Sequence, residues 1–392
     1  MAVRVADTRR RPEVSIGGEA GRILRNLDYV LLGAVAALVA YGLWVLASVS
    51  QNDVPGDPDF FLVRQSVNVA IGVAVLALAT ALNPELYRRL RVPLYAAALI
   101  LLTIVFVADQ VRGTRRWIDI GFFQFQPSEI GKALLILVLA GFLADRARRL
   151  DEWGTTMGAV GLAAVPAALV FLEPDLGTAL VYVAILGAAL FVAGTRWLHL
   201  ATLAAVGVLT VVSLFWLFPA VGIQVLEEYQ IERLTGFLDP DHDPDGATYN
   251  VTQSITAVGS GGLDGRGVEG ATQTNMNYLP EHSTDFIFSS LAEQRGFFGA
   301  ALLLLLYGLV VWRAIRTIAL APSLFTAIVA GAIVVAFVFQ VFVNVGMTIG
   351  VAPITGIPLP FVSYGGSSML VTLGLIGLLQ AIHVRGRLAL ER

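Results

Sequence analysis

Ten long apolar stretches dominate this 392-residue sequence. Most are near 20 residues long and carry few or no charges, which is the length an α-helix needs to cross the ~30 Å hydrocarbon core of a membrane. We therefore predict an all-α polytopic membrane protein with about ten transmembrane helices, at residues 28–49, 61–82, 92–109, 127–144, 156–172, 178–194, 197–218, 296–316, 324–348 and 367–384.

The composition excludes several other classes of protein. The chain is 56% hydrophobic and 14% charged, against roughly 25% charged residues in an average soluble domain. Its net charge of −3 argues against a nucleic-acid partner. The chain has no cysteine, so disulfides and thiol chemistry are excluded as well.

We predict a short tail and one membrane domain. Residues 1–22 are polar and rich in arginine and are expected to be disordered, and residues 23–392 form a single membrane domain. A large extracytoplasmic loop, 219–295, separates the seventh and eighth spans. Its segment 223–238 has helical apolar spacing and is either an interfacial helix or an ordinary packed one. Segment 249–262 is expected to be a short helix that glycines end.

Most of the 26 basic residues lie on the tails and on alternate loops. Because positive loops stay in the cytoplasm, both termini are predicted to be cytoplasmic. The loops that carry polar motifs then lie on the other face: 112–129, 173–177, 219–295 and 350–368. Any chemistry is expected on that extracytoplasmic face.

The segment LPEHSTDFIFSS (279–290) places ionisable groups directly before an apolar helix. Two hypotheses fit Asp285. It is either an acidic residue in the first turn of a helix that Ser283 or Thr284 caps, or a general base held at the membrane surface. Glu281 lies one helical turn earlier and is a candidate for the same ligand. His282 is expected to be an interfacial polar residue, since no cluster around it suggests a metal site.

The segment QPSEIGKALL (126–135) holds Lys132, the only lysine of the chain, three residues after Glu129. The two side chains therefore share one helix face. Ionisable groups inside a span are costly and are functional candidates, although a structural ion pair is the alternative. With Arg115 and Arg116 just upstream, Lys132 would suit a phosphate or pyrophosphate group.

Two further loops carry candidate residues. In EPDLG, Glu173 and Asp175 are either ordinary turn residues or contacts to a cation or sugar. In GIPLPFVSYGGSS, irregular backbone at this depth must be buried or line a cavity. Ser363 and Tyr364 are therefore candidates for a cavity wall.

Together these motifs resemble the SEDS family (shape, elongation, division and sporulation proteins). QPSE with a lysine three residues on, PDLGTA, QS…GSGGL, LPEHSTDFIF and GIPLPFVSYGGSS occur in the family's order from about residue 28 onward. GATQTNMNYLPEHSTDFIF and APITGIPLPF are more similar to the RodA branch than to the FtsW branch. Glu173 stands where the family commonly has glutamine.

The resemblance implies a ten-helix peptidoglycan glycosyltransferase of the bacterial cytoplasmic membrane, acting in cell elongation and shape. Its substrate would be lipid II, and its partner a class B penicillin-binding protein that supplies transpeptidation. The family's essential aspartate matches Asp285. Its cavity-lining acid and lysine match Glu129 and Lys132, and its PDLG aspartate matches Asp175.

The reaction that this resemblance implies joins a sugar hydroxyl to an anomeric carbon and displaces a lipid pyrophosphate. Asp285 is expected to deprotonate the hydroxyl, with inversion at the anomeric carbon. Lys132, Arg115 and Arg116, or a divalent cation such as Mg²⁺ or Mn²⁺, would stabilise the leaving group, and Asp285 is a possible ligand of that cation.

Two alternatives come from other classes. A lipid II flippase or transporter would place its polar groups near the membrane midplane, often within inverted repeats. A non-catalytic scaffold of the cell-wall machinery would tolerate Asp285→Asn. The polar residues of this chain gather instead at the predicted outer ends of the spans.

Overall fold

The structure is a computed structural model that describes residues 16–107, 116–119, 121, 123–220, 222, 231, 236 and 248–391. Its regular structure is helical apart from one antiparallel pair, β1 (Ile118–Asp119) with β2 (Gln124–Phe125). The helices are α1 (Ile16–Arg25), α2 (Tyr29–Val49), α3 (Phe60–Ala81), α4 (Pro84–Arg89), α5 (Arg91–Ile104), α6 (Pro127–Asp145), α7 (Trp153–Leu172), α8 (Leu176–Ala193), α9 (Trp197–Val212), α10 (Phe218–Ala220), α12 (Tyr249–Gly261), α13 (Gly267–Gly270), α14 (Thr272–Asn275), α15 (Ile287–Ala319), α16 (Leu324–Thr348) and α17 (Gly366–Leu390).

Nine helices of the described chain are long and apolar enough to cross a membrane. They match nine of the ten predicted spans, and the prediction of an all-α polytopic membrane protein is confirmed. The remaining predicted span, 92–109, corresponds to α5, which continues as one 3₁₀ turn to Val107. At ~1.5 Å per residue, helix Arg91–Val107 falls slightly short of a ~30 Å core.

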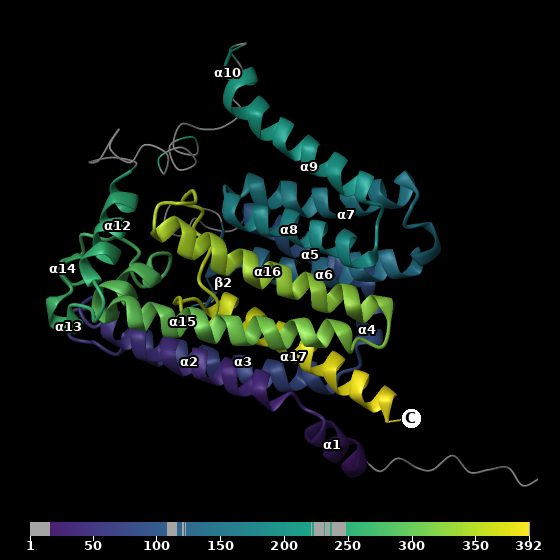
Figure 1. Cartoon of the computed structure of the whole chain (residues 1–392), viewed down its shortest axis with the longest axis horizontal. Helices are drawn as coiled ribbons and strands as arrows, with labels where there is room; N and C mark the ends of the chain where they lie inside the picture. The colour runs from purple at the N-terminus through teal and green to yellow at the C-terminus, as the bar shows by residue number, and fades with distance from the viewer. Residues whose placement is uncertain are drawn as a thin grey trace, which may run out of the picture.

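Figure 1 shows the long helices side by side, with their irregular connections gathered at the two ends of the bundle. Helices α12, α13 and α14 lie at one end, which we call the loop end. Helix α1, helix α4 and the C-terminus lie at the opposite end, which we call the tail end. Helices α6, α16 and α17 are the most buried of the spans, whereas α9 stands away from the bundle and buries only His199, in its first turn.

The tail end is closed by a buried polar network around Asp28. Its carboxylate accepts a hydrogen bond from the backbone N–H of Leu31 at the start of α2, and two from Arg313 Nε, at 3.1 and 2.9 Å. The Asp28 backbone exchanges hydrogen bonds with the Gln380 amide. The network therefore joins α2, α15 and α17.

At the loop end, the connection between α16 and α17 enters the bundle as irregular chain. Gly42 on α2 touches the backbone at Phe361, and Gly177 on α8 touches Thr355 and Ile357. A Cβ built on either glycine would collide with that connection. These two glycines allow the re-entrant segment to lie between helices; we use this name for residues 353–367, which end with the first two residues of α17.

Three expectations need correction or comment. Residues 16–22 of the predicted disordered tail belong to α1, where Arg22 and Arg25 in the last turn suit the helix dipole. Helix α12 confirms the short helix predicted at 249–262; it ends at Gly261, and its C-cap Gly262 has a φ of 55°. Arg115, and the predicted helix at 223–238 apart from residues 231 and 236, lie outside the described residues.

Candidate active site

Asp285 lies in the last turn before α15, at the loop end. The backbone around it is held firmly: Asn344 donates to the Asp285 carbonyl at 2.9 Å, and Tyr364 N–H donates to the Ser283 carbonyl at 3.0 Å. The carboxylate is partly exposed. Its Oδ2 atom faces Gly356, where a Cβ would lie 3.3 Å away and where φ is +71°.

The alternative of a simple helix cap is wrong. Helix α15 begins at Ile287, and its N-cap residue, Phe286, makes no side-chain capping bond. Ser283 and Thr284 instead hold the re-entrant segment, because Ser363 Oγ donates to the Thr284 carbonyl at 2.5 Å. Ser363 is buried, and its Oγ also accepts from the Leu359 N–H at 2.8 Å. These contacts show that Ser363 holds the re-entrant segment, and its predicted place in a cavity wall stays a prediction.

The neighbours of Asp285 in LPEHSTDFIFSS are also fixed. Glu281 is exposed and accepts from Thr284 Oγ1 at 2.7 Å. His282 is buried and places Nε2 2.8 Å from Asp53 Oδ1, with Nδ1 3.1 Å from the Leu279 carbonyl. Burial of the ring opposes its charge, but the hydrogen bond and the charge of Asp53 outweigh burial and raise the pKa of His282. His282 therefore links the segment before α15 to the α2–α3 turn.

Glu129 and Lys132 form a buried ion pair in the first turns of α6. Lys132 Nζ lies 2.7 Å from Glu129 Oε1, and both side chains are almost fully buried. The expected shared face is thus confirmed. Arg116 is likewise engaged, because its guanidinium donates to the backbone carbonyls of Glu173 and Pro174. Both described cations of the predicted pyrophosphate site already have protein partners.

The EPDLG turn joins α7 to α8 and shows the tight hairpin expected. Asp175 caps α8 by accepting from the Thr178 N–H at 3.0 Å, and it also accepts from Gln126 Nε2 at 3.1 Å. Glu173 is buried, and within the described chain neither of its carboxyl oxygens has a hydrogen-bond partner. Burial, and then the charge of Asp175, raise the pKa of Glu173 to about 8, while Arg116 opposes the shift.

The re-entrant segment brings these groups to one end of the bundle. Ser367 Oγ accepts from the Gln126 N–H at 2.9 Å, which ties the segment to the start of α6. Gly177 fits against Thr355 and Ile357, and Gly356 between them faces Asp285. Asp285 thus lies against the same stretch of chain that α8 contacts, and the start of α6 is bound to the end of that segment.

A cavity of about 190 Å³ opens beside Thr284, the residue before Asp285. Helix α3, the β1–β2 region and the start of α17 contribute its walls, which are lined by Phe60, Phe61, Arg64, Asn68, Trp117, Phe123, Gln124, Thr284, Tyr364, Gly365 and Gly366. Of these lining residues, Tyr364 was predicted from the sequence, whereas Arg64 and the other aromatic residues were not. An arginine in the second turn of an apolar span was the signal that pointed to this wall.

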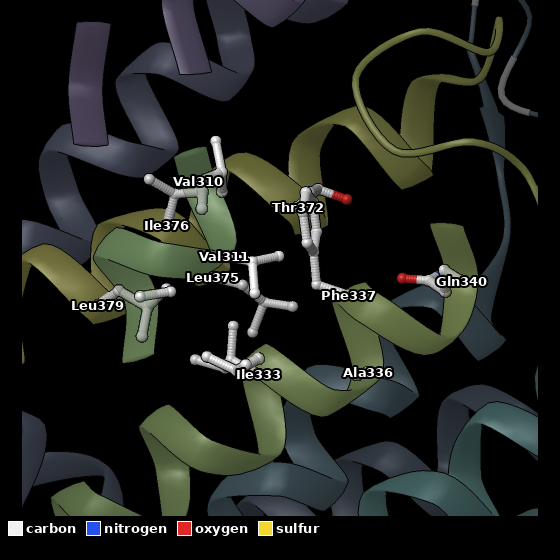
Figure 2. Close-up of a pocket in the computed structure, with 12 residues that line it drawn as sticks. Val310, Val311, Ile333, Ala336, Phe337, Gln340, Thr372, Leu375, Ile376 and Leu379 are labelled. Atoms are coloured by element: carbon white, nitrogen blue, oxygen red, sulfur yellow. The ribbon is translucent and has the colours of Figure 1, made fainter. Parts of the chain in front are cut away.

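A second hollow lies deeper, between α15, α16 and α17, and encloses about 20 Å³ (Figure 2). Its described lining is apolar apart from Gln340 and Thr372. Because it contains no ionisable side chain, this hollow offers nothing for acid, base or phosphate chemistry. The cavity beside Thr284 is therefore the better candidate for a substrate site.

A family model described as a cell cycle protein, which covers FtsW, RodA and SpoVE, matches residues 29–388. The chain belongs to the FtsW/RodA/SpoVE family. Its relatives include the peptidoglycan glycosyltransferase MrdB of Escherichia coli, 35% identical over 93% of this chain and 95% of MrdB. Stage V sporulation protein E of Bacillus subtilis is 35% identical over 90% of this chain and 95% of its own length.

Solved structures show the same family fold. One is a chain from work on the structural coordination of polymerization and crosslinking by a peptidoglycan synthase complex. Its TM-score is 0.77 at 34% identity, covering 92% of this chain and 98% of that chain. The rod shape determining protein RodA of Thermus thermophilus gives a TM-score of 0.66 at 32% identity, with 91% and 96% covered. The FtsW/RodA/SpoVE match establishes a multi-pass membrane protein.

The family resemblance raised the question of a divalent cation in this FtsW/RodA/SpoVE protein. Among the described residues, no three His, Cys, Asp or Glu side chains gather into a metal cage. Mg²⁺, however, commonly uses only one or two carboxylates together with substrate phosphates and water. The partly exposed carboxylate of Asp285 fits that smaller role.

Proposed function

We propose that this protein is a peptidoglycan glycosyltransferase that polymerises lipid II into glycan strands, for cell elongation and shape. The observation that carries the proposal is Asp285: a partly exposed carboxylate on a rigidly held turn, next to a cavity at the end of a membrane bundle. Family membership and the activity named for MrdB support it.

In the proposed reaction, Asp285 accepts the proton of the 4-hydroxyl of one sugar. The hydroxyl oxygen then bonds to the anomeric carbon of a second lipid-linked sugar, and the bond from that carbon to the pyrophosphate oxygen breaks with inversion. The pyrophosphate leaves as a stable anion and needs positive charge rather than a proton. One carboxylate therefore suffices, in contrast to the acid and base pair of most glycosidases.

The rest of the site has supporting roles in this proposal. Glu129, Lys132, Asp175 and Arg116 hold the starts of α6 and α8 in place through the bonds described above. Glu281 and Ser363 fix the turn that carries Asp285. A Mg²⁺ or Mn²⁺ ion brought with the pyrophosphate, with Asp285 as its protein ligand, would add leaving-group stabilisation.

We further propose that the protein lies in the bacterial cytoplasmic membrane with both termini in the cytoplasm. The distribution of arginines supports this orientation, because Arg88, Arg146 and Arg196 lie on connections between spans that alternate along the chain with the motif-bearing ones. The loop end would then face outward, toward lipid II head groups. The similarity to a chain of a peptidoglycan synthase complex supports a class B penicillin-binding protein as the partner.

The purified protein with its partner, supplied with lipid II in detergent and a divalent cation, tests the proposal. We expect glycan strands on a gel, and their loss with Asp285→Asn but not with Asp264→Asn, an exposed aspartate of the same loop region. Polymer formed equally by Asp285→Asn would refute the assigned base. Absence of polymer under every condition, with lipid II crossing liposomes, would indicate a transporter.

A further inference from the structure

The cavity beside Thr284 combines aromatic rings with one exposed cation, Arg64. We propose that this cavity binds the sugar–diphosphate portion of a lipid-linked substrate, with Arg64 contacting the diphosphate and the aromatic rings contacting the adjoining sugar. This inference rests on the proposed glycosyltransferase function, and it assigns the direct phosphate contact to a residue other than Lys132 or Arg116.

Arg64 differs from Lys132 and Arg116 in having no carboxylate or carbonyl partner among the described residues. Lys132 is buried against Glu129, and Arg116 is bonded to two backbone carbonyls. Arg64 is exposed, and within the described chain its guanidinium pairs with no carboxylate. It lies over the Phe60 ring, with Cζ 4.3 Å from the ring centroid. A guanidinium presents a planar fork of donors that matches phosphate oxygens, so Arg64 is free to bind a diphosphate.

Hydrogen bonds connect the part of α3 that carries Arg64 to the turn that carries Asp285. Its neighbour Gln65 is almost fully buried and donates to the Ser363 carbonyl at 3.2 Å, while its Oε1 accepts from the Gly365 N–H. Ser363 in turn donates to the Thr284 carbonyl. A short chain of hydrogen bonds therefore connects the second turn of α3 to the turn that carries the proposed base.

Aromatic side chains form much of the wall of the cavity beside Thr284. Phe60, Phe61, Trp117, Phe123 and Tyr364 all line the cavity, and the Phe61 and Tyr364 rings meet edge to face at 4.8 Å. The flat C–H faces of a pyranose ring are apolar, so aromatic walls favour them while the sugar hydroxyls remain available for polar contacts. The volume of about 190 Å³ suits one sugar unit rather than a whole disaccharide.

The depth of Arg64 agrees with this assignment. The residue lies four positions into α3, or about 6 Å along the helix axis at ~1.5 Å per residue. An arginine this close to the end of a span can extend its guanidinium to the membrane interface. Ordinary phospholipid head groups share this chemistry, and the experiment must therefore separate a substrate diphosphate from a bilayer phosphate.

The test uses the full chain with Asp285→Asn, in nanodiscs of phosphatidylcholine, and measures binding of fluorescent lipid II and of undecaprenyl pyrophosphate. Loss of charge-assisted hydrogen bonds from Arg64→Gln should weaken both ligands by about 10- to 100-fold. Arg64→Lys should recover part of the affinity, because a point charge replaces the fork. Phe123→Leu should weaken lipid II by more than it weakens the sugar-free ligand.

Arg146→Gln is the matched control, because Arg146 is also exposed and lies over a ring four residues before it, Phe142, at 3.8 Å. It should bind both ligands like the parent. Equal binding by Arg64→Gln and Arg146→Gln overturns the inference. An Arg64 effect that appears only when phosphatidylglycerol is added overturns it too, by assigning Arg64 to bilayer phosphate.

The same Arg64 variants, made in a chain that keeps Asp285 and assayed for lipid II polymerisation, separate the two proposals. If the wild type and Arg64→Gln polymerise lipid II equally well, the glycosyltransferase function stands and only the Arg64 site is rejected. A wild-type chain that neither binds nor polymerises lipid II would reject both. Because Arg64 is exposed, its variants should keep the wild-type melting temperature. A loss of ligand affinity at an unchanged melting temperature then reflects binding rather than folding.

Discussion

Asp28 and Asp285 are two aspartates that each precede an apolar helix, at opposite ends of the bundle. Asp28 is buried, and its carboxylate is bonded to the Leu31 N–H and to Arg313. Asp285 is partly exposed; Asn344 donates to its backbone carbonyl, and Ser363 donates to the carbonyl of its neighbour Thr284. The first aspartate is buried in an ion pair, whereas the second is partly exposed on a turn whose backbone is held in place.

The difference shows that a polar residue beside a membrane helix acquires its role from its partners. A buried charge with a complete set of partners contributes to a specific fold, and removing one partner is costly. A carboxylate held through its backbone can exchange a proton without disturbing the bundle. We therefore expect the two residues to separate stability from activity.

The largest effect should follow from Asp285→Asn. Loss of the base should lower lipid II polymerisation by about 100- to 10,000-fold. The midpoint of thermal unfolding should change little, since the Asn344 contact to the Asp285 carbonyl remains. Gel analysis of glycan strands and a thermal shift assay on the same sample check both parts. A large drop in melting temperature would remove the contrast with Asp28.

Asp28→Asn should have the opposite signature. It leaves Arg313 without its anionic partner in a largely buried site, which should lower the free energy of unfolding by roughly 3–5 kcal/mol. Activity per folded molecule should remain close to wild type. Denaturation of the protein in detergent measures the loss, and Asp28→Asn combined with Arg313→Met should recover part of it. Normal stability with lost polymerisation would contradict the structural role.

The Glu129–Lys132 pair tests whether a buried pair at the loop end behaves like the network at the tail end. Lys132→Met alone strands the Glu129 carboxylate and should cost about 3 kcal/mol of stability. The double variant with Glu129→Gln should recover stability. If activity returns with it, the pair acts as a structural support. Recovered stability without activity would show that the ammonium itself acts on the substrate.

The smallest effect concerns Glu173, a buried carboxyl with neither a salt bridge nor a hydrogen bond in the described chain. Its pKa of about 8 exceeds the value near 4.5 of an unfolded chain, so the folded state holds the proton more tightly. Wild-type stability should therefore fall as pH rises from about 4.5 through about 8.

Glu173→Gln should remove that pH dependence and be more stable near neutral pH, by an amount on the order of 1–3 kcal/mol. Melting temperatures across the pH range measure the gap. Glu152→Gln, at an exposed glutamate, is the matched control. Parallel pH profiles of wild type and Glu173→Gln would show that Glu173 ionises normally.

The spans and the main candidate residues could be predicted because they depend on local sequence. Apolar length identified nine long helices, and spacing of three residues paired Glu129 with Lys132. Residues 287–295 were predicted as loop because they include Glu293, Gln294 and Arg295, and they are helical instead. Gly296, with a φ of 64°, breaks α15 after them, so the long apolar part of the helix starts close to the predicted residue 296. Glu293 becomes helical and buried because its carboxylate accepts from the Gln273 and Thr274 N–H groups.

The internal arrangement of the site depends on contacts between distant residues and was not predictable. The bond from Ser363 to Thr284 joins residues 79 positions apart, and Arg116 reaches carbonyls 57 and 58 positions away. No periodicity encodes such pairs. The aromatic cavity likewise draws its walls from α3, the β1–β2 region and α17, each of which looks unremarkable alone.

Gly42, Gly177 and Gly356 have a consequence for genetics. Each lacks a side chain where the re-entrant segment meets a helix or Asp285. Adding one methyl group at these positions would displace the segment without touching a substrate. Partial-loss alleles of this protein should therefore collect at these glycines, away from the residues that line the cavity. Because an added methyl group at Gly42 would meet backbone atoms of Phe361 and Val362, a smaller side chain on the facing segment should not suppress such an allele.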